Sequence, residues 1–307
     1  MNILDFVFPK DLYCISCGRP LPPQGAGGLA LCDRCVSEIS WISGGSCEKC
    51  GRLLADENPG RFCRECEDDG GHMFRRGYAC AVYTGRAADI VREMKYRRKS
   101  WYADTLASLM AAKYFSGADP ETGELPEYDG LAFVPMSARK MAARGYDQAG
   151  LIARGLSRKT GIPFLPGALE RVRETDVMSG LSAGERRQNL AGAFVVPCDM
   201  IDIVAGKKLL IVDDVYTTGS SVGVCAEALL AAGAESVDVL VFAIGADARP
   251  AKSNAEMRQT EEVAEPRLFG ACQGAPERAE ARVLQVRKQE PRGATWQVAK
   301  KTSKWWV

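Results

Sequence analysis

Apolar and polar residues occur along this chain in blocks that predict short buried strands separated by helices. Continuous apolar runs, typical of parallel strands covered on both faces, lie at 78–83, 131–134 and 209–212. Apolar residues at helical spacing predict helices at 86–96, 101–114, 150–159 and 222–232. The acidic stretch 117–128, which contains Pro and Gly, predicts a loop. This alternation over residues 76–248 predicts one Rossmann-like domain with a parallel sheet.

The two ends of the chain have a different composition. Residues 1–72 are rich in cysteine and poor in aliphatic residues. Residues 249–307 are rich in Glu, Arg, Ala, Gln and Lys and show little apolar periodicity, so we expect a mostly disordered tail. Residues 1–8 are apolar but lack a basic leader, and we expect them to dock on the body of the protein rather than act as a signal peptide.

The predicted strand at 209–212 leads into Asp213 and Asp214 and then into a hydroxyl-rich turn at 217–221. Because a helix is predicted directly after this turn, backbone N–H groups and the positive end of the helix dipole would gather there. Gly219 would allow close approach of the backbone, which suits a phosphate monoester. Asp213 and Asp214 would repel a bare phosphate, so the ligand should also carry a vicinal diol or bound Mg²⁺. A ribose 5-phosphate bearing further phosphates meets these conditions.

This order of residues resembles the 5-phosphoribosyl 1-pyrophosphate (PRPP) motif of type I phosphoribosyltransferases. In that motif an apolar strand, an acidic pair and Thr-Thr-Gly follow one another. The other common phosphate loops, G-x-x-x-x-G-K-[ST] and G-x-G-x-x-G after a strand, do not occur in the chain. A strand ending in a solvated acidic turn would explain one Asp and one Gly but not the whole string.

Eight of the twelve cysteines form C-x-x-C pairs: Cys14/Cys17, Cys32/Cys35, Cys47/Cys50 and Cys63/Cys66. Such a pair directs two sulfurs at one ion, so these pairs predict two tetrahedral structural Zn²⁺ sites. We expect sequential pairing, although the spacing also permits interleaved pairing. Disulfides are the alternative, disfavoured by the lack of a secretory signal and by the regular spacing. Metal binding would supply much of the stability of this segment.

The single histidine and the four unpaired cysteines are not needed as ligands, because the eight paired cysteines complete both Zn²⁺ sites. His72, the single histidine, follows the last pair and is expected at the surface. Cys80, Cys198 and Cys225 are expected to be small buried residues, and Cys272 also lacks pair spacing.

The sequence after the strand at 131–134 narrows the choice among families of phosphoribosyltransferases. It continues Pro135-Met136-Ser137-Ala138-Arg139-Lys140 and then Arg144-Gly145-Tyr146-Asp147-Gln148-Ala149. Together with Lys95-Tyr96, Arg186-Arg187-Gln188-Asn189 and Gly192-Ala193-Phe194, it resembles the ComF family over residues 12–245. That family includes ComFC and GntX and often begins with a zinc module. Asp147, Met178 and Lys140 stand where Asn, Gln and Arg are usual; Asp147 either pairs with Arg144 or caps the following helix.

The resemblance implies a double zinc ribbon at 1–72, a type I phosphoribosyltransferase domain at 76–248, and roles by position. Asp213 and Asp214 would hold the ribose hydroxyls, with or without Mg²⁺. The remaining PRPP contacts would come from Val215, Thr217, Thr218, Gly219, Ser220 and Ser221, and from Pro135, Met136 and Ser137 on the pyrophosphate side. Charge moving onto pyrophosphate would be stabilised by Arg139, Lys140 and Arg144.

No protein nucleophile is visible, and none is needed. Departure of pyrophosphate leaves an oxocarbenium-like ribose, so the protein would act by positioning, by metal-assisted charge stabilisation and by exclusion of water. The charged segment 171–189 contains Gly180 and Gly184 and is predicted to close as a lid. Its arginines Arg173, Arg186 and Arg187 would reach phosphate only on closure.

Two classes of function stay open. One is an enzyme that transfers phosphoribosyl from PRPP to an acceptor, for which the sequence holds no specific motif. The other is a single-stranded nucleic-acid-binding protein whose PRPP site is a sensor or relic. The basic run 92–99, with Tyr96 and Trp101 as stacking candidates, supports the second, although a solvated helix surface explains it as well. ComF proteins are associated with DNA uptake during natural transformation, so DNA-uptake machinery is a candidate partner.

Length, net charge and hydrophobic content restrict the class of protein and its location in the cell. The 307 residues carry a formal net charge of +1, 46% are hydrophobic, and no apolar run is long enough to span a membrane. We therefore expect a cytoplasmic protein of two folded units. The near-neutral charge argues against nucleic-acid binding over the whole surface. Nothing in the sequence specifies an oligomeric state.

Overall fold

The computed structural model describes residues 12–22, 29–54, 61–68, 72–117, 122–175 and 183–246. The expected docking segment 1–8 and disordered tail 249–307 lie outside these residues, as do Met178 and Cys272. In the part of the chain that the structure describes, none of the helices combines the length and apolar character needed to cross a membrane.

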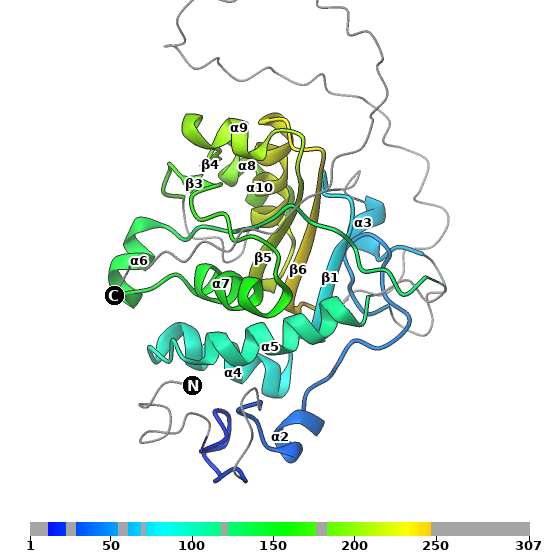
Figure 1. Ribbon diagram of the computed structural model, residues 1–307, viewed down its shortest axis with the longest axis vertical. Helices are drawn as coiled ribbons and strands as arrows, with labels where there is room; N and C mark the ends of the chain where they lie inside the picture. Colours follow the sequence, from blue (N-terminus) through cyan, green and yellow to red (C-terminus); the bar gives the residue numbers. More distant parts are fainter. Residues whose placement is uncertain are drawn as a thin grey trace, which may run out of the picture. The chain divides into compact units, whose positions relative to one another are not determined.

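A four-stranded parallel sheet forms the centre of the α/β region (Figure 1). Its strands, in spatial order, are β1 (Gly77–Val82), β6 (Ser236–Ile244), β5 (Lys208–Tyr216) and β2 (Gly130–Phe133). The predicted Rossmann-like parallel sheet is confirmed. The strand predicted at 209–212 is longer than expected, because Asp213 and Tyr216 are still paired with β6.

Helices cover both faces of this sheet (Figure 1). One face packs against α4 (Gly85–Tyr96), α5 (Tyr102–Phe115) and α7 (Gln148–Thr160). The other lies under α10 (Ser220–Ala231), with α8 (Ala183–Leu190) and α9 (Ile201–Val204) on the same side. Since side chains alternate along a strand, Leu210 and Val212 pack in the first cluster, and Leu209 and Ile211 pack in the second.

Smaller elements complete the region between β2 and β5. The segment after β2 contains a short helix, α6 (Ala138–Arg144), which ends at Gly145 in the left-handed conformation (φ 83°). Two short antiparallel strands, β3 (Glu170–Arg171) and β4 (Phe194–Val195), pair at the two ends of the segment predicted as a lid. The one-turn helix η1 (Cys198–Met200) follows β4.

The two cysteine-rich ribbons contact opposite faces of the sheet. The first carries α2 (Asp33–Ser37), and its Cys14 and Cys35 lie in the cluster of α4 and α5. The second carries α3 (Arg64–Asp68), and its cysteines lie in the cluster of α10. Between them, the Ile42 N–H donates to the Cys80 carbonyl over 2.9 Å, so this segment covers the edge of β1.

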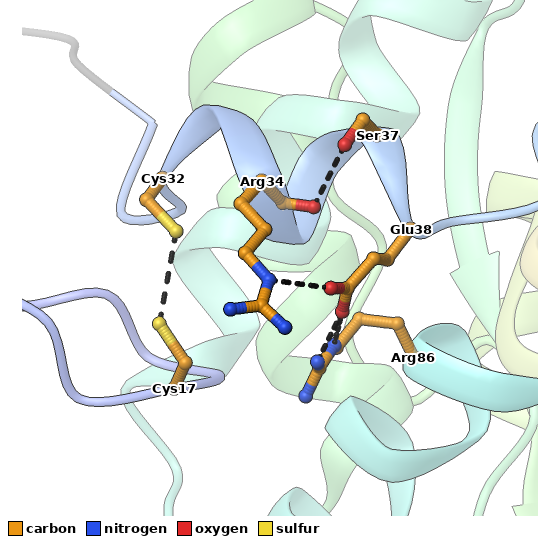
Figure 2. Close-up of polar contacts among 6 residues, drawn as sticks. All are labelled: Cys17, Cys32, Arg34, Ser37, Glu38 and Arg86. Carbon is orange, nitrogen blue, oxygen red and sulfur yellow. Dashed lines mark hydrogen bonds and ion pairs between the residues drawn. The ribbon is translucent and has the colours of Figure 1, made fainter.

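An ion-pair cluster fastens the first ribbon to α4. Glu38 accepts hydrogen bonds from Arg34 and from Arg86 of α4, as Figure 2 shows. The Arg34 Nε to Glu38 Oε1 distance is 2.8 Å, and Arg86 Nε lies 2.9 Å from Glu38 Oε2. Arg34 is exposed, and Glu38 and Arg86 are partly exposed, so these ion pairs orient the ribbon more than they stabilise it.

Two expectations about single residues are wrong. His72 is buried, at 4% exposure, rather than at the surface. It stacks on Phe74 with 5.1 Å between ring centroids and meets Tyr216 edge-on, because the chain leaving the second ribbon passes beneath α10. Cys198 is exposed, because it lies in the one-turn helix η1 at the surface. Cys80 and Cys225 are buried, as expected.

Candidate active site

The candidate site lies at the carboxyl end of β5, the edge at which parallel α/β sheets bind their ligands. Asp213 and Asp214 are in the last part of the strand, and the turn that follows leads into α10 at Ser220. Gly219 has a left-handed conformation (φ 73°), and a Cβ atom there would overlap the ring of Tyr216. The hydroxyl oxygens of Thr218 and Ser220 lie 2.9 Å apart. The structure therefore places the predicted phosphate turn at the start of a three-turn helix, where amide groups lack intrahelical partners.

Lys95, at the end of α4, pairs with the buried Asp214: Nζ lies 2.7 Å from Oδ1. Burial alone would lower the pKa of Lys95, but the charges of Asp214 and Asp213 raise it above its usual value. Sequence reasoning had placed Lys95 only in the family pattern and in the basic run 92–99. Its spacing of four residues from the buried Val91 puts it on the inner face of α4, a signal that could have identified it.

Asp213 has a different environment from its neighbour. Its Oδ1 accepts the Asp214 backbone N–H over 2.8 Å. Burial and the charge of Asp214 raise the pKa of Asp213 to about 8, against the opposing effect of Lys95. The two neighbouring carboxylates therefore disfavour each other's negative charge. A bound divalent cation would relieve this repulsion, and the carboxylate oxygens could also accept hydrogen bonds from a diol.

The predicted pyrophosphate-side residues lie in the turn before α6. Ser137 is buried and caps α6 by accepting the Lys140 N–H over 3.4 Å. Asp147 caps α7 by accepting the Gly150 N–H over 3.1 Å, and its other oxygen accepts the Met136 N–H over 2.9 Å. Asp147 is thus a helix cap rather than a partner of Arg144, and it also fixes the turn at Met136.

The predicted cations gather beside this turn. Burial, together with the charges of Arg171, Arg144, Lys95 and Arg139, lowers the pKa of Lys140. Arg144 donates to Gln148 Oε1 over 2.9 Å and lies over the ring of Tyr96. So much positive charge around Lys140 favours a polyanionic ligand.

Arg171 and Glu174 were not singled out from the sequence. Arg171 lies at the start of the predicted lid, and its charge acts on Lys140. Glu174 accepts the Arg139 N–H over 3.3 Å. Both lie in the charged segment 171–189, in which no sequence pattern distinguishes them from the other charged residues.

The predicted lid arginines are placed only in part. Arg173 donates to the carbonyls of Asn189 and Ala191 over 2.7 and 2.8 Å, which joins the two ends of the segment. Arg186 and Arg187 belong to α8, but their side chains lie outside the described residues. Closure of this segment stays a prediction.

The eight paired cysteines form two tetrads: Cys14, Cys17, Cys32 and Cys35; and Cys47, Cys50, Cys63 and Cys66. All sulfurs of a tetrad lie within 4.8 Å of one another and are free thiols, which confirms sequential pairing and leaves no disulfide among them. The Cys17–Cys32 distance (Figure 2) is 3.7 Å and the Cys50–Cys63 distance is 3.5 Å. Tetrahedral Zn²⁺ with four thiolates needs sulfurs about 3.8 Å apart, so both tetrads fit structural Zn²⁺.

Comparison with known proteins agrees with this arrangement. The family model described as a double zinc ribbon domain matches residues 3–67, and the phosphoribosyl transferase domain model matches residues 142–271. Among solved structures, the glutamine PRPP amidotransferase of Bacillus subtilis is 23% identical, with a TM-score of 0.30. The match covers 47% of this chain and 26% of the amidotransferase chain. A structural match at that score adds no weight.

The similar curated proteins match about two thirds to three quarters of this chain. DNA utilization protein YhgH of Salmonella typhi is 32% identical over 74% of this chain and 94% of its own length. Competence protein F of Haemophilus influenzae is 30% identical over 78% and 97%, and competence protein ComFC of Bacillus subtilis is 22% identical over 66% and 79%. The chain therefore belongs to the ComF family, in which a double zinc ribbon precedes a phosphoribosyltransferase domain.

Proposed function

We propose that this protein binds PRPP with Mg²⁺ at the carboxyl end of β5 and transfers its phosphoribosyl group to an acceptor. One observation carries the proposal: Asp213 and Asp214 lie in the last part of a buried strand, and Gly219 turns the chain from that strand directly into α10. The names of the relatives, DNA utilization protein and competence protein, support a link between this activity and DNA uptake.

The proposal assigns each part of PRPP to one part of the site. The 5-phosphate would lie against the turn from Thr217 to Ser221, where hydroxyl and amide donors meet the start of α10. The ribose hydroxyls would face Asp213 and Asp214, and Mg²⁺ would supply charge neutralisation between this pair and the pyrophosphate. The pyrophosphate would extend toward Lys140 and the cations around it.

In the proposed reaction, the bond between ribose C1 and the pyrophosphate oxygen breaks, and a bond from C1 to the acceptor nucleophile forms. Pyrophosphate leaves with the electron pair of the broken bond, and the acceptor loses a proton to water. Lys140, Arg139 and Arg144 would stabilise the charge that moves onto the leaving group. Asp213 and Asp214 would hold the ribose in place while its positive charge develops.

Calorimetric titration of the zinc-loaded protein with Mg²⁺ and PRPP tests the binding step. We expect the double variant Asp213→Asn/Asp214→Asn to bind PRPP about 30-fold more weakly, because charge-assisted hydrogen bonds are lost while the phosphate turn remains. Asp202→Asn, on the exposed surface of α9, is the control and should bind normally. Absence of binding by the wild type would refute the proposal. Binding would justify a search for acceptors by pyrophosphate release.

A second function, binding of single-stranded nucleic acid, is favoured by two exposed aromatic side chains. Tyr96 is 74% exposed and Trp101 62% exposed, on either side of Arg97, Arg98 and Lys99. Bases stack on such rings, and neighbouring cations contact the phosphates. The cationic charge is partly balanced, since Arg97 and Lys99 both pair with Glu93 at 3.0 and 2.7 Å. The exposed aromatic rings therefore support nucleic-acid binding more strongly than the charged side chains do.

Fluorescence anisotropy with a labelled single-stranded oligonucleotide separates the two functions. We expect Tyr96→Ala/Trp101→Ala to weaken binding about tenfold or more through lost stacking. Phe115→Ala, which removes an exposed ring at the far end of α5, should have no effect. Affinity that is insensitive to salt, or equal in all three proteins, would exclude this function.

A further inference from the structure

Arg52 of the second ribbon lies buried against the phosphate turn, although no role in the site was assigned to it. Its side chain is 4% exposed. The Arg52 carbonyl accepts the Cys47 N–H over 2.7 Å, so its backbone belongs to the metal-binding knuckle. Gly51 before it has a φ of 76°, and a Cβ atom there would lie 2.7 Å from the Gly77 carbonyl oxygen. The position of Arg52 is therefore fixed by the ribbon itself.

The Arg52 guanidinium joins three separate segments of the protein. Nη1 donates to the carbonyls of Gly245 and Ala246, just after β6, over 2.8 and 3.0 Å. Nη2 donates to the Thr217 carbonyl over 2.9 Å and to Glu65 of α3. A rigid planar fork that reaches the metal-binding ribbon and the phosphate turn together can transmit the position of one to the other.

The contact with Thr217 determines how the turn presents its donors. The peptide between Thr217 and Thr218 is planar and trans, so its N–H points away from the carbonyl oxygen that Arg52 holds. The Gly245 N–H also donates to the Tyr216 carbonyl over 2.9 Å, which anchors the preceding peptide. The backbone entering Gly219 is therefore held from the ribbon side, and its amide donors are set before any ligand binds.

We propose that Arg52 is a positioning residue that couples the metal state of the second tetrad to the conformation of the turn at 217–221. If the turn binds the 5-phosphate of PRPP, as the proposed function requires, the metal state of the second tetrad also affects the affinity for PRPP. Coupling of two binding events is reciprocal, so PRPP should slow zinc release from the second tetrad. The first ribbon contacts α4 and α5 instead, as its hydrogen bond from Tyr102 to Ile15 shows, so its zinc should be unaffected.

Hydrogen exchange of the full-length, zinc-loaded protein tests the coupling without any ligand. In Arg52→Met we expect amides of the peptide covering 217–221 to exchange about tenfold faster, the size expected for lost charge-assisted hydrogen bonds. Arg61→Met is the matched control, because Arg61 belongs to the same ribbon but pairs with Glu48 at the surface. Unchanged exchange in Arg52→Met, with two zinc ions still bound, would overturn the proposal.

Arg52→Lys is a second variant that tests the same contact if Arg52→Met misfolds. Lysine keeps the charge but replaces the two-nitrogen fork with a single nitrogen, so we expect faster exchange of 217–221 with an intact fold. If Arg52→Met loses zinc or unfolds, Arg52→Lys decides the question on its own. Exchange equal to wild type in Arg52→Lys would then refute the proposal.

Titration with Mg²⁺ and PRPP, and release of zinc to a chromogenic chelator, complete the test. We expect Arg52→Met to bind PRPP about tenfold more weakly. PRPP should slow the release of one of the two zinc ions in the wild type and in Arg61→Met, but of neither in Arg52→Met. A wild type that fails to bind PRPP would refute the proposed function, while the exchange result still decides the coupling. Wild-type binding that is retained in Arg52→Met, with unchanged exchange, would refute the coupling alone.

Discussion

Gly219→Ala is expected to weaken PRPP binding by roughly 100-fold, or about 2.8 kcal/mol. Gly219 has φ 73°, and the added Cβ would overlap the ring of Tyr216. That ring cannot move aside, because it is buried against His72 and Phe74. The turn itself must shift, and the phosphate then loses its amide and hydroxyl donors together. Calorimetric titration with Mg²⁺ and PRPP measures the loss.

Gly161→Ala separates backbone strain from the overlap with Tyr216. Gly161 ends α7 with φ 80°, and its Cβ would meet no atom within 4 Å. This variant should lose about 1 kcal/mol of stability and keep its affinity for PRPP. Equal affinities of wild type and Gly219→Ala would show that the turn does not bind phosphate.

Cys63→Ser is expected to remove one of the two zinc ions and to lower stability by about 3 kcal/mol or more, which corresponds to roughly 6–12 °C in Tm. Cys63 is fully buried in the same cluster as Tyr216, Val222 and Cys225. Loss of the metal would therefore expose apolar surface of β5 and α10 as well as the ribbon. Zinc analysis and thermal unfolding give the two quantities.

Cys17→Ser is the comparison for the other tetrad. Cys17 is exposed, so loss of the first zinc should loosen its own ribbon and lower Tm by less than half as much. Similar Tm values for the two variants would contradict the expectation that the second tetrad supports the α/β core more than the first, whose Cys14 and Cys35 also lie in a core cluster.

The local parts of the site were predictable because they are encoded by neighbouring residues. The apolar run of β5, the acidic pair and the turn into α10 follow one another within a short stretch, and C-x-x-C spacing determines ligand geometry directly. Even there, the length of β5 was underestimated, since the pairing of Asp213 and Tyr216 with β6 depends on a distant strand.

The remaining parts depend on how distant segments pack. Lys95 and Asp214 are far apart in the chain and meet because α4 lies along the end of β5. Arg52 follows a zinc knuckle and, from sequence alone, has the character of a surface arginine. Only the packing of the second ribbon on α10 buries it and directs it to Thr217. His72 was assigned wrongly for the same reason, because its burial comes from Phe74, Tyr216 and α10 together.

The contact between Arg52 and Gly245 has a consequence for biosynthesis. The second tetrad is complete once Cys66 has been made, but the segment at Gly245 that holds Arg52 is translated about 180 residues later. At ~5–20 residues per second, the ribbon waits roughly 10–40 s for its packing surface. Metal binding during that interval would protect the thiols from oxidation, so we expect early zinc supply to raise the yield of folded protein.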